Sequence, residues 1–169
     1  MHKLWTQIAT EFRDYDERLI FAGVNEMIVQ SLEGQNDFNS EPTEEQQEVL
    51  QGLYQEFIDA VRETGGNNRW RCLTVASWAA NPYFALKFFK QPKDVVPDRL
   101  MLEVHYYQPW WFCAQTNGEE GEFKNQYFWG KPYENEPCSS NTQAEVKRLF
   151  RELKAKFIDK GLPVILGEM

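Results

Sequence analysis

Four short apolar segments lie along this chain, and polar residues follow or end each of them. They cover residues 19–24, 70–77, 100–107 and 163–167. Short apolar runs of this kind are typical of strands that are buried in a parallel sheet. The first run continues into Asn25 and Glu26, and the last continues into Glu168. We therefore expect four strands that carry polar side chains at their carboxyl ends.

Between these segments, apolar residues recur at the spacing of amphipathic helices. The first helix is expected over residues 3–15, and a short one over residues 83–90. Capping-box patterns at Thr43-x-x-Gln46 and Thr142-x-x-Glu145 predict the starts of two longer helices. Gly65, Gly66 and Gly161 are expected to end them. Residues 28–42 and 108–141 are predicted to be loops.

Helix and strand alternate in this prediction, which indicates an α/β fold with right-handed crossovers and a parallel sheet. At 169 residues the chain is expected to form a single domain, residues 1–169. It is short for a (β/α)8 TIM barrel, which usually needs about 250 residues. In such a barrel, every polar group at a strand's carboxyl end would lie on one rim.

The charge of the chain excludes several classes of partner. The formal net charge is −8 and no basic run is present, so nucleic acid and anionic membranes are poor partners. No apolar run approaches the length of a membrane helix, and residues 1–18 lack the apolar core of a signal peptide.

The cysteines have no C-x-x-C spacing, so we expect no structural zinc. Cys72 is expected to be buried, and pairing of Cys113 with Cys138 stays open.

Two glutamates, Glu26 and Glu168, occupy matching positions after apolar runs, and this pairing is the main functional signal. Glycoside hydrolysis needs two carboxyl groups that flank the scissile bond, one protonated and one ionised. Asn25, His105 and Tyr107 also follow or end predicted strands and are expected on the same rim. A tyrosine hydroxyl could orient the nucleophile, and a histidine could tune the acid or bind a sugar hydroxyl. Alternatively, His105 belongs to the core and Tyr107 only closes the barrel.

Aromatic residues are dense after the third predicted strand. The segment 108–133 includes Trp110, Trp111 and Trp129. A loop this long in a compact domain is functional or disordered, and its aromatic content argues against disorder. We expect these residues, together with Trp78 and Asn81 after the second strand, to contact a substrate. Loop packing is the alternative for the Trp110–Trp111 pair.

The ordered motifs resemble glycoside hydrolase family 5, the cellulase family, whose members are (β/α)8 barrels with two catalytic glutamates. Gly23-Val24-Asn25-Glu26 is similar to the end of the family's fourth strand, which carries the acid/base. His105-Tyr106-Tyr107 resembles the end of its sixth strand, and Gly167-Glu168 resembles the end of its seventh, which carries the nucleophile. The resemblance implies a retaining endo-β-1,4-glucanase with Glu26 as acid/base, Glu168 as nucleophile and no cofactor.

The chain also departs from the family pattern. Met27 stands where the family usually has proline, a change that we expect to be tolerated. The resemblance covers only the fourth to seventh strands, so we expect a partial barrel of about four parallel strands. The groups that the family brings from its other strands are not among these motifs. A complete protein of this kind is expected to be a monomer, and a polysaccharide substrate implies a secreted or cell-surface location.

Two other classes of protein remain as alternatives. A carbohydrate-binding module or an inactive fragment could use the aromatic loop, but binding alone needs no pair of glutamates. A metal-dependent hydrolase would need a third clustered ligand, and the chain has only His2 and His105 to offer. Within the family, the sequence leaves open xyloglucan, mixed-linkage glucan, xylan or mannan in place of cellulose-type β-1,4-glucan.

Overall fold

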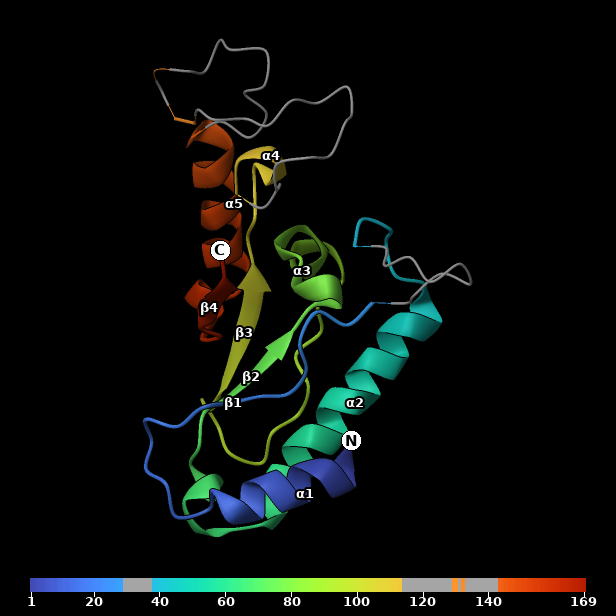
Figure 1. Ribbon diagram of the computed structural model, residues 1–169, viewed down its shortest axis with the longest axis vertical. Helices are drawn as coiled ribbons and strands as arrows, with labels where there is room; N and C mark the ends of the chain where they lie inside the picture. The colour runs from blue at the N-terminus through green and yellow to red at the C-terminus, as the bar shows by residue number, and fades with distance from the viewer. Residues whose placement is uncertain (29–37, 114–128, 131, 133–142) are drawn as a thin grey trace.

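The computed structural model describes residues 1–28, 38–113, 129–130, 132 and 143–169. Within them, four strands form one parallel sheet in the order β1-β2-β3-β4. The strands are β1 (Phe21–Ala22), β2 (Leu73–Ala76), β3 (Leu100–His105) and β4 (Val164–Glu168). Figure 1 shows β2 and β3 as neighbouring arrows of this curled sheet, which corresponds to half of a barrel. The predicted α/β fold with four parallel strands is confirmed.

The expected helices are also present. They are α1 (His2–Glu11), α2 (Glu44–Glu63), α3 (Pro82–Phe88) and α5 (Gln143–Lys156), joined by the short helices η1 (Gly66–Arg69), η2 (Trp78–Ala80), α4 (Trp110–Cys113) and η4 (Ile158–Lys160). Thr43 and Gln46 form the predicted capping box at the start of α2. Gly65 and Gly66 follow its end with φ angles of 70° and 55°, which suit glycine. Thr142, the expected cap of α5, lies outside the described residues.

The hydrophobic core lies between one face of the sheet and the helices. Leu100, Leu102 and Val104 of β3 are buried in it, together with side chains from α2 and α5, whereas Met101 and Glu103 of β3 are partly exposed. Alternate residues of a strand point to opposite faces, so Glu103 and His105 share the inner face of the curled sheet. This alternation places charged groups on the face that does not carry the helices.

The amino-terminal ends of the strands are fixed by a buried arginine. The Arg71 side chain is 1% exposed and donates hydrogen bonds to the backbone carbonyls of Phe12, Tyr15, Asp16 and Leu19. These bonds tie the connection between α1 and β1 to the base of β2. Cys72, which was expected to be buried inside a strand, is partly exposed and directly precedes β2.

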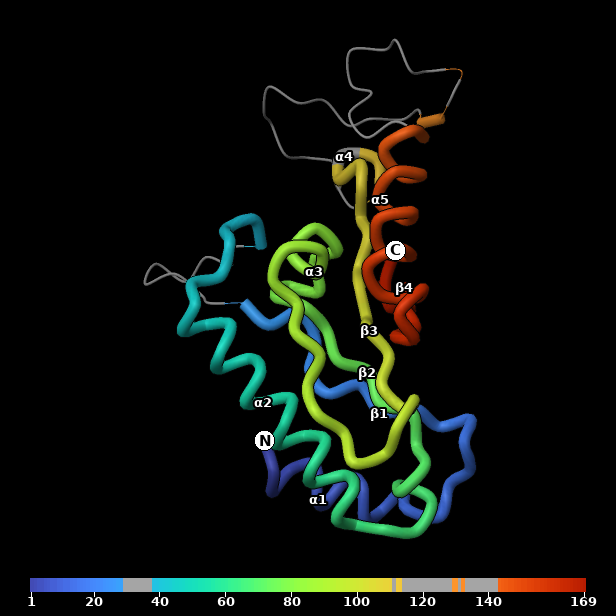
Figure 2. The backbone as a smooth tube through the Cα atoms, turned by 180° about the vertical axis from the view of Figure 1, so that it is seen from behind, coloured from blue at the N-terminus to red at the C-terminus, as the bar shows by residue number. Residues whose placement is uncertain are grey.

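The opposite end of the sheet carries the carboxyl ends of the strands. The arrows of β2 and β3 point toward the end of the molecule that carries α3 and α4 (Figure 1), and the reverse view in Figure 2 shows the same arrangement. In the described part of the chain, no helix combines the length and apolar character that crossing a membrane requires.

Candidate active site

A cavity of about 400 Å³ opens at the carboxyl ends of the strands. Both predicted catalytic glutamates line it, and so do His105 and Tyr107 from the end of β3. The remaining lining residues are Phe38, Asn39, Ala79, Asn81, Pro82, Tyr83, Tyr106, Gln108 and Trp110. Residues that are far apart in the sequence therefore meet on one rim, as the prediction of a barrel-like sheet required.

A register shift between β3 and β4 turns Glu168 into the cavity. Val104 pairs with Leu166, but the next residue, His105, pairs with Glu168, so Gly167 is an extra residue in β4. In a regular strand, Glu168 would share the face of Leu166, which packs against the core. A bulge of this kind re-aims the side chain that follows it. The bulge thus brings the carboxyl group of Glu168 next to the ring of His105.

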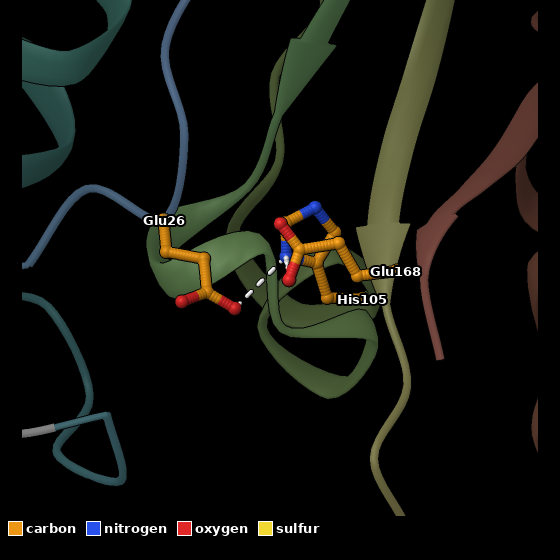
Figure 3. A group of neighbouring side chains, drawn as sticks. All are labelled: Glu26, His105 and Glu168. Atoms are coloured by element: carbon orange, nitrogen blue, oxygen red, sulfur yellow. Dashed lines mark hydrogen bonds and ion pairs between the residues drawn. The ribbon is translucent and has the colours of Figure 1, made fainter.

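The three side chains Glu26, His105 and Glu168 form a compact group (Figure 3). His105 Nδ1 lies 2.8 Å from Oε1 of Glu26 and 3.6 Å from Oε2 of Glu168. One side-chain oxygen or nitrogen of each residue falls within a mutual distance of 4.8 Å. The imidazole is only 3% exposed and contacts both carboxyl groups. The side chains of Glu26 and Glu168 remain partly exposed, at 24% and 39%.

Charge and burial act in opposite directions on His105. Burial lowers the pKa of the ring, but the hydrogen bonds to Glu26 and Glu103 and the charge of Glu168 outweigh burial and raise that pKa above its ordinary value of 6.5. The alternative that His105 is only a core histidine does not fit this position, since His105 lines the cavity and both of its ring nitrogens contact carboxylates.

Tyr107 orients the other glutamate. Its hydroxyl donates a hydrogen bond of 2.7 Å to Oε2 of Glu168. This bond, then burial, raises the pKa of Tyr107 above 10.0, so the phenol keeps its proton and remains a donor. The ring of Trp110 meets Tyr107 edge to face at 6.2 Å and is 49% exposed beside the cavity. Tyr107 therefore contacts both Glu168 and the exposed Trp110.

Not every predicted contact residue reaches the cavity. Asn81 lines it, but its side chain caps α3 by accepting hydrogen bonds from the backbone of Tyr83 and Phe84. Trp78 is buried in the core at 7% exposure and lines a different, smaller cavity, because the chain turns back through η2 after β2. Its assignment to substrate binding has no support from this position. Asn25 is exposed and, like Trp129, is not among the described residues that line the cavity.

Most of the aromatic segment that was predicted to bind substrate lies outside the described residues. Trp110 is the tryptophan of this segment that the structure places at the cavity. Cys113 is an exposed free thiol, and Cys138 lies outside the described residues. The prediction that residues 108–133 contact substrate thus stays a prediction, with Trp110 in a position at the cavity that allows such a contact.

Glu103 was not among the residues predicted from the sequence, but it contacts His105 directly. Its Oε1 lies 3.2 Å from Nε2 of His105, and its Oε2 accepts a hydrogen bond of 2.5 Å from Thr74. The alternation of residues in β3 could have predicted this contact, because Glu103 and His105 are two residues apart and therefore share one face of the sheet. Tyr83 and Tyr106 were also missed, and both line the cavity.

The group formed by Glu26, His105 and Glu168 is compact enough to hold a cation, and it is the cluster of this kind found among the described residues. A pair of catalytic carboxyl groups needs the same proximity, so this geometry alone does not indicate a metal. That the site works without metal or cofactor stays a prediction.

Comparison with known proteins identifies the family. The family model described as Cellulase (glycosyl hydrolase family 5) matches residues 1–169. A xyloglucan-specific endo-beta-1,4-glucanase of Bacteroides ovatus is 38% identical over 169 residues, which are 99% of this chain and 32% of that protein. Endoglucanase A of Paenibacillus barcinonensis is 34% identical over 179 residues, covering 98% of this chain and 41% of that protein.

A solved structure shows the same similarity in three dimensions. The Bacteroides ovatus GH5 xyloglucanase in complex with a XXXG heptasaccharide superposes with a TM-score of 0.85 at 36% identity, over 98% of this chain and 34% of that one. The chain thus spans between 32% and 41% of the length of these proteins, and its curled sheet corresponds to part of their TIM barrel. With a match over its whole length, the chain belongs to glycoside hydrolase family 5, the cellulase family.

Proposed function

We propose that this chain carries the two catalytic carboxyl groups of a retaining endo-β-1,4-glucanase, with Glu168 as nucleophile and Glu26 as acid/base. The observation that carries the proposal is the separation of these groups, whose facing atoms lie within 4.8 Å of each other. Retaining glycosidases keep their carboxyl groups about 5–5.5 Å apart, whereas inverting enzymes need about 6.5–9.5 Å to admit a water molecule.

Hydrogen bonding supports the division of roles. Glu168 accepts a hydrogen bond from Tyr107, which holds its carboxyl group in one orientation, as a nucleophile requires. Glu26 contacts a ring nitrogen of His105, a group that can share a proton with it. In the first step, Glu168 would attack the anomeric carbon while Glu26 protonates the departing oxygen. In the second, Glu26 would deprotonate the water that releases the sugar from Glu168.

We propose a β-1,4-linked glucan polymer as the substrate class. The named activities of the relatives support this choice, since they include endoglucanases and xyloglucanases. The exposed face of Trp110 beside the cavity offers a surface on which the apolar face of a sugar ring can pack. Xylan and mannan are alternative substrates. A polymer outside the cell further supports a secreted or cell-surface location, and we propose a monomer that uses no nucleic acid or membrane partner.

The test uses the full-length gene product and two glutamate variants. Wild type should release reducing ends from a soluble β-glucan, and ¹H NMR should detect the β-anomer first, as retention requires. Glu168→Gln should still bind the polymer but lose hydrolysis, which separates an enzyme from a binding module. Glu56→Gln, the same change at an exposed position on α2, is the matched control and should behave as wild type.

A second substrate assigns the acid/base. Glu26→Gln should lose activity on the polymer but retain bond cleavage with 2,4-dinitrophenyl cellobioside, whose leaving group needs no proton. Added azide should then accelerate its turnover, because azide needs no general base to attack the glycosyl-enzyme. Initial release of the α-anomer, or equal losses of kcat/KM on both substrates in Glu26→Gln, would contradict the proposal.

A further inference from the structure

His105 lies between two carboxyl groups, one at each ring nitrogen. Nδ1 is 2.8 Å from Oε1 of Glu26, and Nε2 is 3.2 Å from Oε1 of Glu103. A neutral imidazole has one donor nitrogen and one acceptor nitrogen, and the partner of one nitrogen decides the role of the other. The residue that is hydrogen-bonded to Nε2 therefore determines whether Nδ1 acts as a donor or as an acceptor toward Glu26.

Glu103 is itself held from two sides. Thr74 on β2 donates a hydrogen bond of 2.5 Å to its Oε2, which leaves Oε1 for His105. On β4, Gly167 has no side chain, and a Cβ at that position would lie 2.9 Å from both Cγ and Cδ of Glu103. The side chain is 17% exposed, so its charge is largely removed from water. Contacts from β2 and β4 thus fix the position of this carboxylate on β3.

We propose that Glu103 is a positioning residue that acts on the acid/base through His105. As an acceptor, Glu103 binds the Nε2 hydrogen and fixes the ring in the orientation in which Nδ1 faces Glu26. The single proton in the Nδ1–Glu26 contact is then the proton that leaves for the glycosidic oxygen. Glu103 keeps its charge throughout and transfers no proton. This inference rests on the proposed role of Glu26.

The electrostatics agree with this arrangement. The charged or titratable groups that face His105 are Glu103 on its own strand, Glu26 after β1 and Glu168 on β4, with Tyr107 bonded to Glu168. Against the effect of burial, the contacts with Glu26 and Glu103 raise the pKa of the ring. Removal of the Glu103 charge should therefore lower the pKa of His105. The proton in the Nδ1–Glu26 contact should then be lost at lower pH.

The experiment compares two substrates in the full-length gene product. Glu103→Leu removes the acceptor, and we expect kcat on a soluble β-glucan to fall about tenfold or more, within the 10²–10⁴-fold that a general acid supplies. The loss in kcat/KM on 2,4-dinitrophenyl cellobioside should stay below threefold, because kcat/KM reports only the first step, in which that leaving group needs no proton. Glu103→Gln retains an acceptor oxygen and should recover part of kcat. KM should change less than threefold in both variants.

The pH profile separates positioning from a purely structural role. Glu103→Gln should move the alkaline limb of kcat on β-glucan to lower pH, because the pKa of His105 falls with the lost charge. Thr74→Val, which frees Glu103 but keeps its charge, should reduce kcat on β-glucan with the same substrate selectivity. Glu56→Gln, an exposed glutamate on α2, is the matched control for the loss of one charge.

Several outcomes would overturn the inference. These are equal losses on the two substrates, an unchanged alkaline limb in Glu103→Gln, or wild-type kcat in Glu103→Leu. If Glu103→Leu does not fold, Thr74→Val decides by the same comparison of substrates. If Glu26→Gln itself shows no substrate selectivity, the proposed function fails instead. If Glu26→Gln is selective and the variants at Glu103 and Thr74 are not, only the role of Glu103 fails.

Discussion

Gly167→Ala tests how tightly the inner face of the sheet is packed around Glu103. The new Cβ would lie 2.9 Å from Cγ and Cδ of Glu103, whereas carbon atoms prefer separations of about 3.5–4.0 Å. The Glu103 side chain must therefore move by about 0.6 Å or more. Its contact with His105 is already 3.2 Å long, and hydrogen bonds fail beyond about 3.5 Å. A displacement of that size is enough to break the contact.

The size of the effect follows from the bond that is lost. A hydrogen bond to a charged group contributes about 1.5–3 kcal/mol. If this contribution acts in the transition state, kcat/KM on β-glucan should fall about ten- to a hundredfold, at 1.36 kcal/mol for each factor of ten. The φ angle of Gly167 is not in the positive region, so the cost comes from contact and not from backbone strain.

The assay is kcat/KM for a soluble β-glucan in the full-length gene product, with circular dichroism to verify folding. Gly52→Ala is the matched control, because a Cβ at Gly52 on α2 meets nothing within 4 Å. Alanine in a helix is more stable than glycine by roughly 0.5–1 kcal/mol, so this control should be active and slightly stabilised. In a Glu103→Ala background, Gly167→Ala should cost less than about threefold, because the clashing partner is gone. Activity within twofold of the control, or the full loss in the double variant, would refute the reasoning.

Three further predictions concern binding, pH and the isolated segment. Trp110→Ala should raise KM for β-glucan about two- to tenfold, since aromatic contacts contribute about 0.5–1.5 kcal/mol, and a large drop in Tm with normal KM would contradict this. The raised pKa of His105 contributes stability that is complete below pH 6.5 and is lost as the pH rises through the pKa of the folded state. Urea unfolding should detect this decline in the free energy of unfolding in wild type, and the decline should vanish in His105→Gln. Residues 1–169 expressed alone should be inactive and lack cooperative unfolding, because β1 and β4 end the described sheet and its inner face carries charge; a soluble monomer whose hydrolysis is lost in Glu168→Gln would show the opposite.

The chain order of apolar runs and helical stripes was sufficient to predict the sheet and the edge that carries the candidate site. Strand-end positions placed Glu26, His105, Tyr107 and Glu168 together, and the structure brings all four to one cavity. Boundaries were less accurate: β1 has only two residues, although residues 19–24 are apolar. Strand length depends on which neighbouring backbone is available for pairing, and local hydrophobicity does not encode that.

Other features depend on contacts that no local pattern contains. The bulge at Gly167 exists only in relation to the pairing partner, and it decides which face Glu168 occupies. Trp78 follows β2 directly, but positive φ angles at Ala79 and Ala80 turn the chain back and leave the indole in the core. Glu103 has an ordinary strand position, and its importance appears only with Thr74 and His105 around it.

The most direct test of the central claim is a covalent trap of the nucleophile. A 2-deoxy-2-fluoro β-cellobioside with a good leaving group slows the second step of a retaining mechanism, so the glycosyl-enzyme accumulates. Mass spectrometry of the digested full-length gene product should find one added fluorosugar on the peptide that contains Glu168. An adduct on Glu26, or wild-type turnover of β-glucan without any adduct, would contradict the assignment of Glu168 as the nucleophile of a retaining glucanase.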